Sequence, residues 1–258
     1  MSNLIQEVIS PGLLRITLNR PEAFNSLSED LLGDLKKTLS SISTKTDTRV
    51  VILAANGKAF CAGHDLKEMM QEPSETYYQS LFTKCTEMML TLQRMPQPVI
   101  AQVQGIATAA GCQLVAMCDL AVASENAKFA VSGINLGLFC STPGVALSRN
   151  LLRKQALEML LTGEFLTASE AKEKGLVNRV VPAEQLEAET IALAKIILSK
   201  PAEAVRLGKQ LFYRQIEQPI QDAYNDAGSV MACNMMDKDA LEGVQAFIDK
   251  RKPAWAGS

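Results

Sequence analysis

The chain has 258 residues, of which 47% are apolar and 21% are charged, with a formal net charge of −2. This composition predicts one large domain, or a domain with an appendage, and excludes a mostly disordered chain. The small net charge excludes a global attraction to nucleic acid or to an anionic membrane, so an anionic ligand would have to be held by local groups. No apolar run approaches the length of a transmembrane helix, and no membrane partner is expected.

The start of the chain, MSNLIQEVIS, contains an acidic residue and no basic stretch followed by an apolar one. It therefore does not fit a secretory signal peptide. The six cysteines include no CxxC pair, and we interpret them as reduced thiols in or near the core of a cytosolic protein. We accordingly expect a cytoplasmic location.

His64 is the single histidine of the chain, and Asp65 follows it directly. No ligand cluster surrounds His64 in the sequence, so no metal site is expected. A Ser-His-Asp or Cys-His mechanism would have to use His64, yet no GxSxG elbow supplies a nucleophile. Walker A and GxGxxG fingerprints are absent as well, which argues against nucleotide hydrolysis and Rossmann-type dinucleotide binding.

Short β-branched runs alternate with amphipathic segments in the first part of the chain. Ser28 is a plausible N-cap for a helix that follows it. The continuous apolar run at 50–54 indicates a strand buried on both faces. The patterns predict strands at 13–19, 50–54, 99–103, 120–123, 128–130 and 176–181, and helices after Ser28, at 75–94 and at 112–118.

From residue 183 onward the strand signals stop, and only helical patterns follow. This shift in composition predicts an α/β core over residues 1–200 and an all-helical region over 201–258. The predicted helices lie at 183–199, 202–214, 220–236 and 238–251.

Two segments place small residues where a helix is expected to begin. In KAFCAGHDLKEM (58–69), Ala62-Gly63 precedes an acidic helix start, and in GIATAAGCQLVAMCD (105–119), residues 109–111 precede a buried helix. Backbone N–H groups at such starts lack partners, and two that converge would form an oxyanion hole for a thioester enolate. The alternative is that the small residues merely allow each helix to pack closely against a strand.

Several runs together resemble the crotonase (enoyl-CoA hydratase/isomerase) superfamily in their order and spacing. They span essentially the whole chain: LNRPEAFNSL, AFCAGHDLKEM, GIATAAGCQLVAMCDLAVAS, LTGEFLTASEAKEKGLVNRVVP and EGVQAFIDKRKPAW. The resemblance implies an α/β crotonase spiral of repeated strand-strand-helix units, followed by a C-terminal all-helical region that builds trimers, often stacked as a dimer of trimers. It also implies an acyl-CoA thioester as ligand, with no separate cofactor.

The resemblance further implies a role for individual residues. The backbone N–H groups of His64 and Ala110 would form the oxyanion hole. Phe247 and Lys250 of the closing helix would contact coenzyme A, and the basic run Lys250–Lys252 is also a reasonable phosphate anchor, although such a run can be merely solvated. The coenzyme A path would follow Ala62, near the adenine, and then His64, Asp65, Leu66 and Lys67.

The chain departs from the family pattern at the two glutamates that activate water and deliver a proton in a hydratase. Gln113 stands at the first position and Gly133 at the second. Neither can exchange a proton near neutral pH, and general acid–base catalysis typically contributes about 10²–10⁴-fold to a rate. We therefore expect hydration to be weak or absent, and isomerisation, which needs the second position, to be weakened.

Other groups near these positions offer no carboxylate. They are Asn135, Cys140, Ser141, Thr142 and the side chain of His64. Cys140 as a nucleophile and His64 as a base remain alternatives, whereas Asp119 is interpreted as structural.

Three functions are compatible with this sequence. The first is an acyl-CoA-processing enzyme of nonstandard chemistry that stabilises a thioester enolate. The second is a noncatalytic protein that binds or senses acyl-CoA. The third, a structural oligomer with a vestigial pocket, is disfavoured by the small residues at 62–63 and 109–111 together with Phe247 and Lys250.

Overall fold

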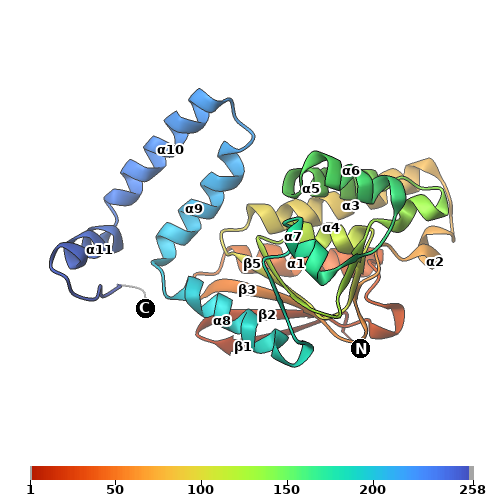
Figure 1. Cartoon of the computed structure of the whole chain (residues 1–258), viewed down its shortest axis with the longest axis horizontal. Helices are drawn as coiled ribbons and strands as arrows, with labels where there is room; N and C mark the ends of the chain where they lie inside the picture. The colour runs from red at the N-terminus through yellow and green to blue at the C-terminus, as the bar shows by residue number, and fades with distance from the viewer. Residues whose placement is uncertain (1, 256–258) are drawn as a thin grey trace.

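Consecutive strands of the chain are divided between two sheets (Figure 1), in a computed structural model that describes residues 2–255. The six-stranded sheet has the order β1 (Leu4–Ser10), β2 (Gly12–Leu18), β3 (Thr48–Ala55), β5 (Val99–Val103), β7 (Leu120–Ser124) and β10 (Arg179–Val181). The four-stranded sheet has the order β4 (Ala59–Cys61), β6 (Ile106–Thr108), β8 (Lys128–Ala130) and β9 (Leu166–Thr167).

The pairing of these strands reveals a repeated unit. β3, β5 and β7 are parallel neighbours in the first sheet, and the strands that directly follow them, β4, β6 and β8, are parallel neighbours in the second. A helical segment follows each such pair of strands. The predicted spiral of strand-strand-helix units is confirmed.

The helices of the body cover both faces of the larger sheet. α1 begins after Ser28, whose hydroxyl accepts a hydrogen bond from the Leu31 N–H at 3.2 Å, as the sequence predicts. None of the helices among the described residues is both long and apolar enough to cross a lipid bilayer. The helices of the body are α1 (Glu29–Ser43), α2 (Leu66–Met69), α3 (Glu75–Arg94), α4 (Ala110–Met117), α5 (Ser141–Asn150), α6 (Arg153–Thr162), α7 (Ala168–Glu173) and α8 (Leu186–Leu198).

β3 is buried on both faces, as its continuous apolar run predicts. Val51 and Leu53 belong to the main core under α1 and α3, whereas Val50 and Ile52 belong to a second core against α8. Because successive side chains of a strand point to opposite faces, one strand contributes to both cores. The central sheet is thereby fixed between two layers of helices.

Several short elements escape the sequence patterns. β1, β4, β6, β9 and α5 to α7 were not predicted. The strands β4, β6 and β9 have only two or three residues, which show no period, and α5 carries Pro143 and Gly144. The strand predicted at 176–181 is shorter in the structure and consists of β10 alone. The helix predicted at 238–251 ends at Ile248, and Lys250 has a left-handed φ of 55°.

Three C-terminal helices project from the body (Figure 1). They are α9 (Ala202–Gln215), α10 (Ile220–Met235) and α11 (Lys238–Ile248), in agreement with the predicted all-helical region. The domain boundary at residue 200 stays a prediction, and residues 1 and 256–258 of the two predicted regions lie outside the described residues.

A buried ion pair attaches α9 to the body. The Lys209 ammonium donates hydrogen bonds to the Asp119 carboxylate at 2.7 Å and to the carbonyls of Leu92 and Gln97, each at 2.8 Å. The Tyr213 hydroxyl donates to the other oxygen of Asp119 at 2.8 Å. Asp119 therefore has the structural role that the sequence analysis assigned to it.

Replacing Lys209 by methionine should destabilise the protein strongly. The change leaves the buried Asp119 carboxylate without its counter-charge, which typically costs about 3–5 kcal/mol in the free energy of unfolding. Urea denaturation would measure this loss, with Lys195→Met on the exposed face of α8 as the matched control. A loss no larger than that of the control would show that the pair does not hold α9.

Candidate functional site

The N-terminus of α4 has an unusual backbone. Ala109, its N-cap, has φ 51° and ψ −122°, a combination that residues with a side chain rarely adopt. Ala110 is the first residue of the helix, so its N–H has no intrahelical acceptor. No backbone carbonyl among residues 2–255 accepts a hydrogen bond from it.

His64 presents a second N–H in a similar way. Leu27 and His64 form an isolated parallel bridge, in which Leu27 donates to the Gly63 carbonyl at 2.7 Å and accepts from the Asp65 N–H at 3.2 Å. In a parallel bridge the residue between these two bonds turns its own N–H and C=O to the opposite side. Within the described part of the chain, no backbone carbonyl accepts the His64 N–H.

The two segments that carry these N–H groups are in direct contact. A Cβ placed on Gly63, at φ 92°, would lie 2.9 Å from the Ala109 Cβ and 3.4 Å from the Ala110 nitrogen. A Cβ on Gly111 would lie 2.0 Å from the Cys61 carbonyl oxygen. The glycines thus serve close packing, and the same packing brings residues 64 and 110 to one end of α4.

The His64 side chain lies in an apolar environment. Its ring is tilted by 59° against Phe82 of α3, with the ring centroids 5.5 Å apart. Neither ring nitrogen has a hydrogen-bond partner in the described chain, and burial lowers the pKa of the imidazole. The Leu27 backbone opposes this effect only in part, so the ring is neutral near pH 7, and no side chain is hydrogen-bonded to it that would orient it as a base.

The single histidine gives the protein a specific pH dependence. Because the folded-state pKa of His64 lies below its unfolded value of about 6.5, the unfolded chain binds the proton first. The contribution of neutral His64 to the free energy of unfolding is therefore fully present above about pH 6.5. It is lost as the pH falls from there through the folded-state pKa. We expect the free energy of unfolding to begin to fall as the pH drops below about 6.5 in the wild type, and to show no such onset in His64→Leu. Equal slopes in the two proteins would contradict this assignment.

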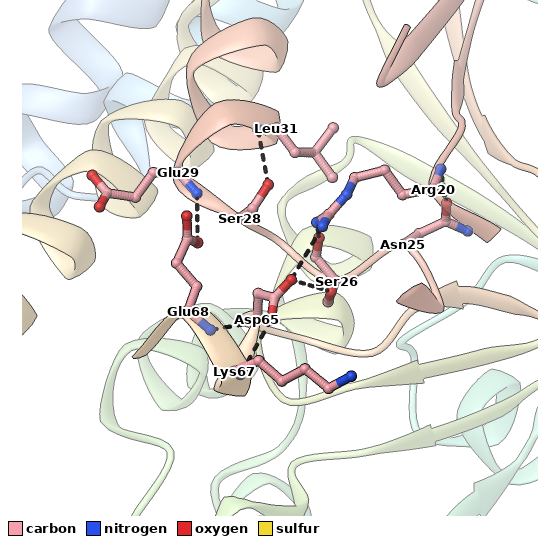
Figure 2. Close-up of polar contacts among 9 residues, drawn as sticks. All are labelled: Arg20, Asn25, Ser26, Ser28, Glu29, Leu31, Asp65, Lys67 and Glu68. Atoms are coloured by element: carbon pink, nitrogen blue, oxygen red, sulfur yellow. Dashed lines mark hydrogen bonds and ion pairs between the residues drawn. The ribbon is translucent and has the colours of Figure 1, made fainter. Parts of the chain in front are cut away.

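The Asp65 carboxylate connects the start of α2 to the segment that carries Arg20 and Ser26 (Figure 2). One oxygen accepts from the backbone N–H groups of Lys67 and Glu68, and the other accepts from Arg20 at 3.1 Å and Ser26 at 3.3 Å. Burial raises the pKa of Asp65, but these donors outweigh it and hold the pKa below its ordinary value. The side chain that was expected along the coenzyme A path is engaged within the protein.

The neighbours of Asp65 differ in exposure. Leu66 and Lys67 are exposed on α2, and Figure 2 shows the Lys67 side chain extending away from the Asp65 carboxylate. The N–H of Ala62 donates to the Phe24 carbonyl at 3.1 Å. Of the predicted path, then, the exposed side chains of residues 66 and 67 are available to a ligand.

Gln113 lies one helical turn after Ala110 and lines a cavity of about 860 Å³. The cavity is bounded by residues of α3, α4, α5 and α9. Gln113 is buried, and its side chain has no hydrogen-bond partner among the described residues. Gln113, which the resemblance matches to the first glutamate of a hydratase, thus lines a cavity.

Gly133 lies in a closed environment. A Cβ at this position would lie 2.7 Å from the Cys140 sulfur and 2.7 Å from the Leu138 carbonyl oxygen. Burial raises the pKa of the Cys140 thiol, which opposes its use as a nucleophile. The space that a side chain at 133 would need is filled by the segment 138–140.

Even a small side chain at 133 should therefore be costly. We expect Gly133→Ala to lower the free energy of unfolding by about 1–3 kcal/mol, because overpacking forces its neighbours to shift. Adding Cys140→Ala should restore part of the loss by removing the sulfur. Chemical denaturation of the two single variants and the double variant tests this coupling. Strict additivity would show that Gly133 and Cys140 are not in contact.

Phe247 and Lys250 lie far from the rest of the predicted site. Figure 1 shows α11 and α2 at opposite ends of the molecule, and Phe247 is 85% exposed. In the neighbouring basic run, Arg251 is paired with Glu242 at 2.6 Å. Within one chain, these residues do not join the segment that carries His64.

Other residues at the site were not predicted individually. Leu27, Arg20 and Ser26 position the loop around His64, and they lie in the run LNRPEAFNSL, which was used only as a family motif. Phe82 contacts His64 from α3, for which the sequence analysis predicted only a helix at 75–94. In the described chain, no group of three or more His, Cys, Asp or Glu side chains could hold a metal ion.

The alternation of strands between two sheets, with the small-residue start of α4 packed on β4, defines a crotonase-fold protein. A model of the enoyl-CoA hydratase/isomerase family matches residues 9–258. The chain belongs to this family.

Individual relatives agree with this assignment. The mouse protein named enoyl-CoA hydratase domain-containing protein 3, mitochondrial, is 47% identical over 245 residues, which cover 95% of this chain and 82% of the relative. The runs GHDLKE, ATAAGCQLVA and LGLFCSTPGVAL predict a resemblance to this type, and the mouse protein confirms it.

Solved structures are also similar to this chain. A crystal structure of enoyl-CoA hydratase from Mycobacterium smegmatis is 61% identical, covers 99% of each chain and has a TM-score of 0.97. The structure of human enoyl-CoA hydratase domain-containing protein 3 is 44% identical, covers 98% of this chain and 100% of that chain, and has a TM-score of 0.94.

The names of the relatives contradict the predicted cytoplasmic location. The mouse, Xenopus laevis and human relatives are all named as mitochondrial proteins. The prediction rested on reduced cysteines and on the lack of a secretory signal. Neither feature separates the cytosol from a mitochondrion, because transit peptides differ in composition from secretory signals.

Proposed function

We propose that the protein binds an acyl-CoA thioester and polarises its carbonyl with the backbone N–H groups of His64 and Ala110. Two preorganised donors aimed at a developing enolate oxygen typically stabilise it by several kcal/mol in a site shielded from water. The polarisation needs no metal and no separate cofactor, because the donors belong to the backbone.

One observation carries this proposal. The N–H groups of His64 and Ala110 both lack a backbone acceptor among residues 2–255, and the contact of Gly63 with Ala109 and Ala110 brings their segments together. Ala110 is buried and His64 half-buried, and donors without a partner are rare in buried backbone, since each costs the free energy of a lost hydrogen bond. Two at the end of one helix are readily explained by a bound oxygen, and the strained backbone of Ala109 is consistent with a functional constraint.

Standard hydration is not part of the proposal. Gln113 has no exchangeable proton near neutral pH, and Gly133 has neither a side chain nor the space for one. The two carboxylates that line the cavity are engaged, Asp119 with Lys209 and Glu217 with Arg149. The chemistry favoured here is a reaction of the thioester enolate that does not depend on that pair of glutamates.

A noncatalytic role in binding or sensing acyl-CoA is the second candidate. It is favoured by the packing around Gly133, where the Cys140 sulfur and the Leu138 carbonyl exclude a side chain. Under this candidate the protein would hold the thioester without turning it over.

Phe247 and Lys250 enter this proposal only through a second copy of the chain. They are exposed on the projecting C-terminal helices, so contact with coenzyme A would require a neighbour in a homotrimer or a dimer of trimers. The many exposed apolar residues of these helices, such as Phe212, Tyr224 and Met231, support such an assembly.

The polarised carbonyl can be observed directly. Isotope-edited infrared spectra of butyryl-CoA labelled with ¹³C at the carbonyl should show the stretch at lower frequency when the ligand is bound. Ala110→Pro removes one donor at the first helical position and should abolish most of the shift. Because proline also restricts the residue before it, and Ala109 already has a strained backbone, circular dichroism must first show that the variant is folded. Ala168→Pro, at the first position of α7, is the matched control. A bound ligand without any shift in the wild type would rule out the proposed contact.

The absence of hydration needs its own measurement. The ultraviolet band of crotonyl-CoA should stay constant over time with a high concentration of the purified protein. Rapid loss of the band would mean that another side chain supplies the proton chemistry, and the argument from Gln113 and Gly133 would then be wrong.

A further inference from the structure

Arg20 joins the segment 25–26 to Asp65 (Figure 2). One of its Nη atoms donates to the Ser26 carbonyl at 2.6 Å, and the other donates to the Asp65 carboxylate at 3.1 Å. The backbone N–H of Arg20 donates to the Asn25 side-chain oxygen at 2.9 Å. The side chains of Arg20 and Asp65 are only 21% and 16% exposed, so salt and water screen this ion pair less than one on the open surface.

These contacts support the bridge that orients the His64 N–H. Leu27 and His64 are the paired residues of that bridge. Ser26 directly precedes Leu27, and Asp65 directly follows His64. Arg20 therefore spans the bridge, from Ser26 on one side to Asp65 on the other. Because a parallel bridge decides which way the paired residue turns its N–H, the direction of this donor depends on the same contacts.

Asp65 also places a negative charge one residue away from the His64 N–H. Burial raises the pKa of this carboxyl group, but the hydrogen bonds that it accepts, above all from Arg20, hold the pKa below its ordinary value. The group is therefore ionised near pH 7, and an anion beside an oxyanion hole opposes the negative charge that develops on a bound oxygen. Among the ion pairs of the described residues, Arg20 is the cation at Asp65, whereas the Lys67 side chain extends away from the carboxylate (Figure 2).

We propose that Arg20 is a positioning residue of the thioester site, which holds the His64 N–H in place and neutralises the charge of Asp65 beside it. The inference rests on the proposed function, because it assumes a thioester oxygen at this N–H. The guanidinium of Arg20 is engaged by Ser26 and Asp65 and needs no contact with the ligand. It acts on the carbonyl through the neighbouring charge and through the bridge between Leu27 and His64.

Infrared spectra of bound butyryl-CoA, labelled with ¹³C at the carbonyl, test this role in the full chain at saturating ligand. Arg20→Met should lose about half of the wild-type frequency shift, because the Ala110 N–H is then the remaining undisturbed donor. Asp65→Asn should enlarge the shift, because it removes the anion, keeps an acceptor oxygen and leaves the positive charge of Arg20 in place. A merely structural role of the ion pair would move both variants in the same direction.

Arg15→Met is the matched control. Arg15 is also an ion-paired arginine with a side chain that is 17% exposed, but its partners Glu7 and Glu187 belong to β1 and α8. This variant loses a cation of similar burial and should keep the wild-type shift.

The outcomes separate this inference from the proposed function. If the wild type shows a shift, but Arg20→Met and Asp65→Asn do not move it in these two opposite directions, the inference is wrong and the proposed function stands. If bound butyryl-CoA shows no shift in the wild type, the proposed function fails and the inference fails with it. Circular dichroism first establishes that each variant is folded. Should Arg20→Met not fold, Asp65→Asn alone decides: an enlarged shift supports the inference, and an equal or smaller one contradicts it.

Discussion

The contact between Gly111 and the Cys61 carbonyl determines the arrangement of the site. A Cβ at residue 111 would lie 2.0 Å from that oxygen, so α4 can start on β4 only if the position carries no side chain. This approach fixes the direction of α4, the strained backbone of Ala109, and the meeting of the segments that carry residues 64 and 110. The buried helix then carries Gln113 to the cavity. The geometry proposed for thioester binding thus depends on one helix being seated directly on one strand.

The predictability of the fold depended on the length and period of each segment. The helix α3 and the apolar strand at 50–54 were found because many residues repeat one signal, and Ser28 was found because its residue type is typical of an N-cap. β4 and β6 carry no period in three residues, although they place the two small-residue segments next to each other. Their pairing is a property of the spiral, which only the family resemblance indicated.

The site was predictable only where a local sequence signal has a direct structural meaning. The small residues at 63 and 109–111 marked the two backbone positions, because glycine and alanine there have a steric meaning that can be read locally. The role of Asp65 could not be read, since its partners Arg20 and Ser26 lie about forty positions earlier in the chain and meet it only after folding. The distance between α11 and α2 likewise follows from the projecting helices and not from any local pattern.

The packing around Gly133 also limits how the protein could be redesigned. One substitution cannot place a carboxylate at this position, because the Cys140 sulfur and the Leu138 carbonyl occupy the volume that its first carbon would need. A designer who wants a proton donor here would have to rebuild the segment 138–140 in the same step. The position and the segment that covers it therefore form one unit of design, in which neither can be changed alone.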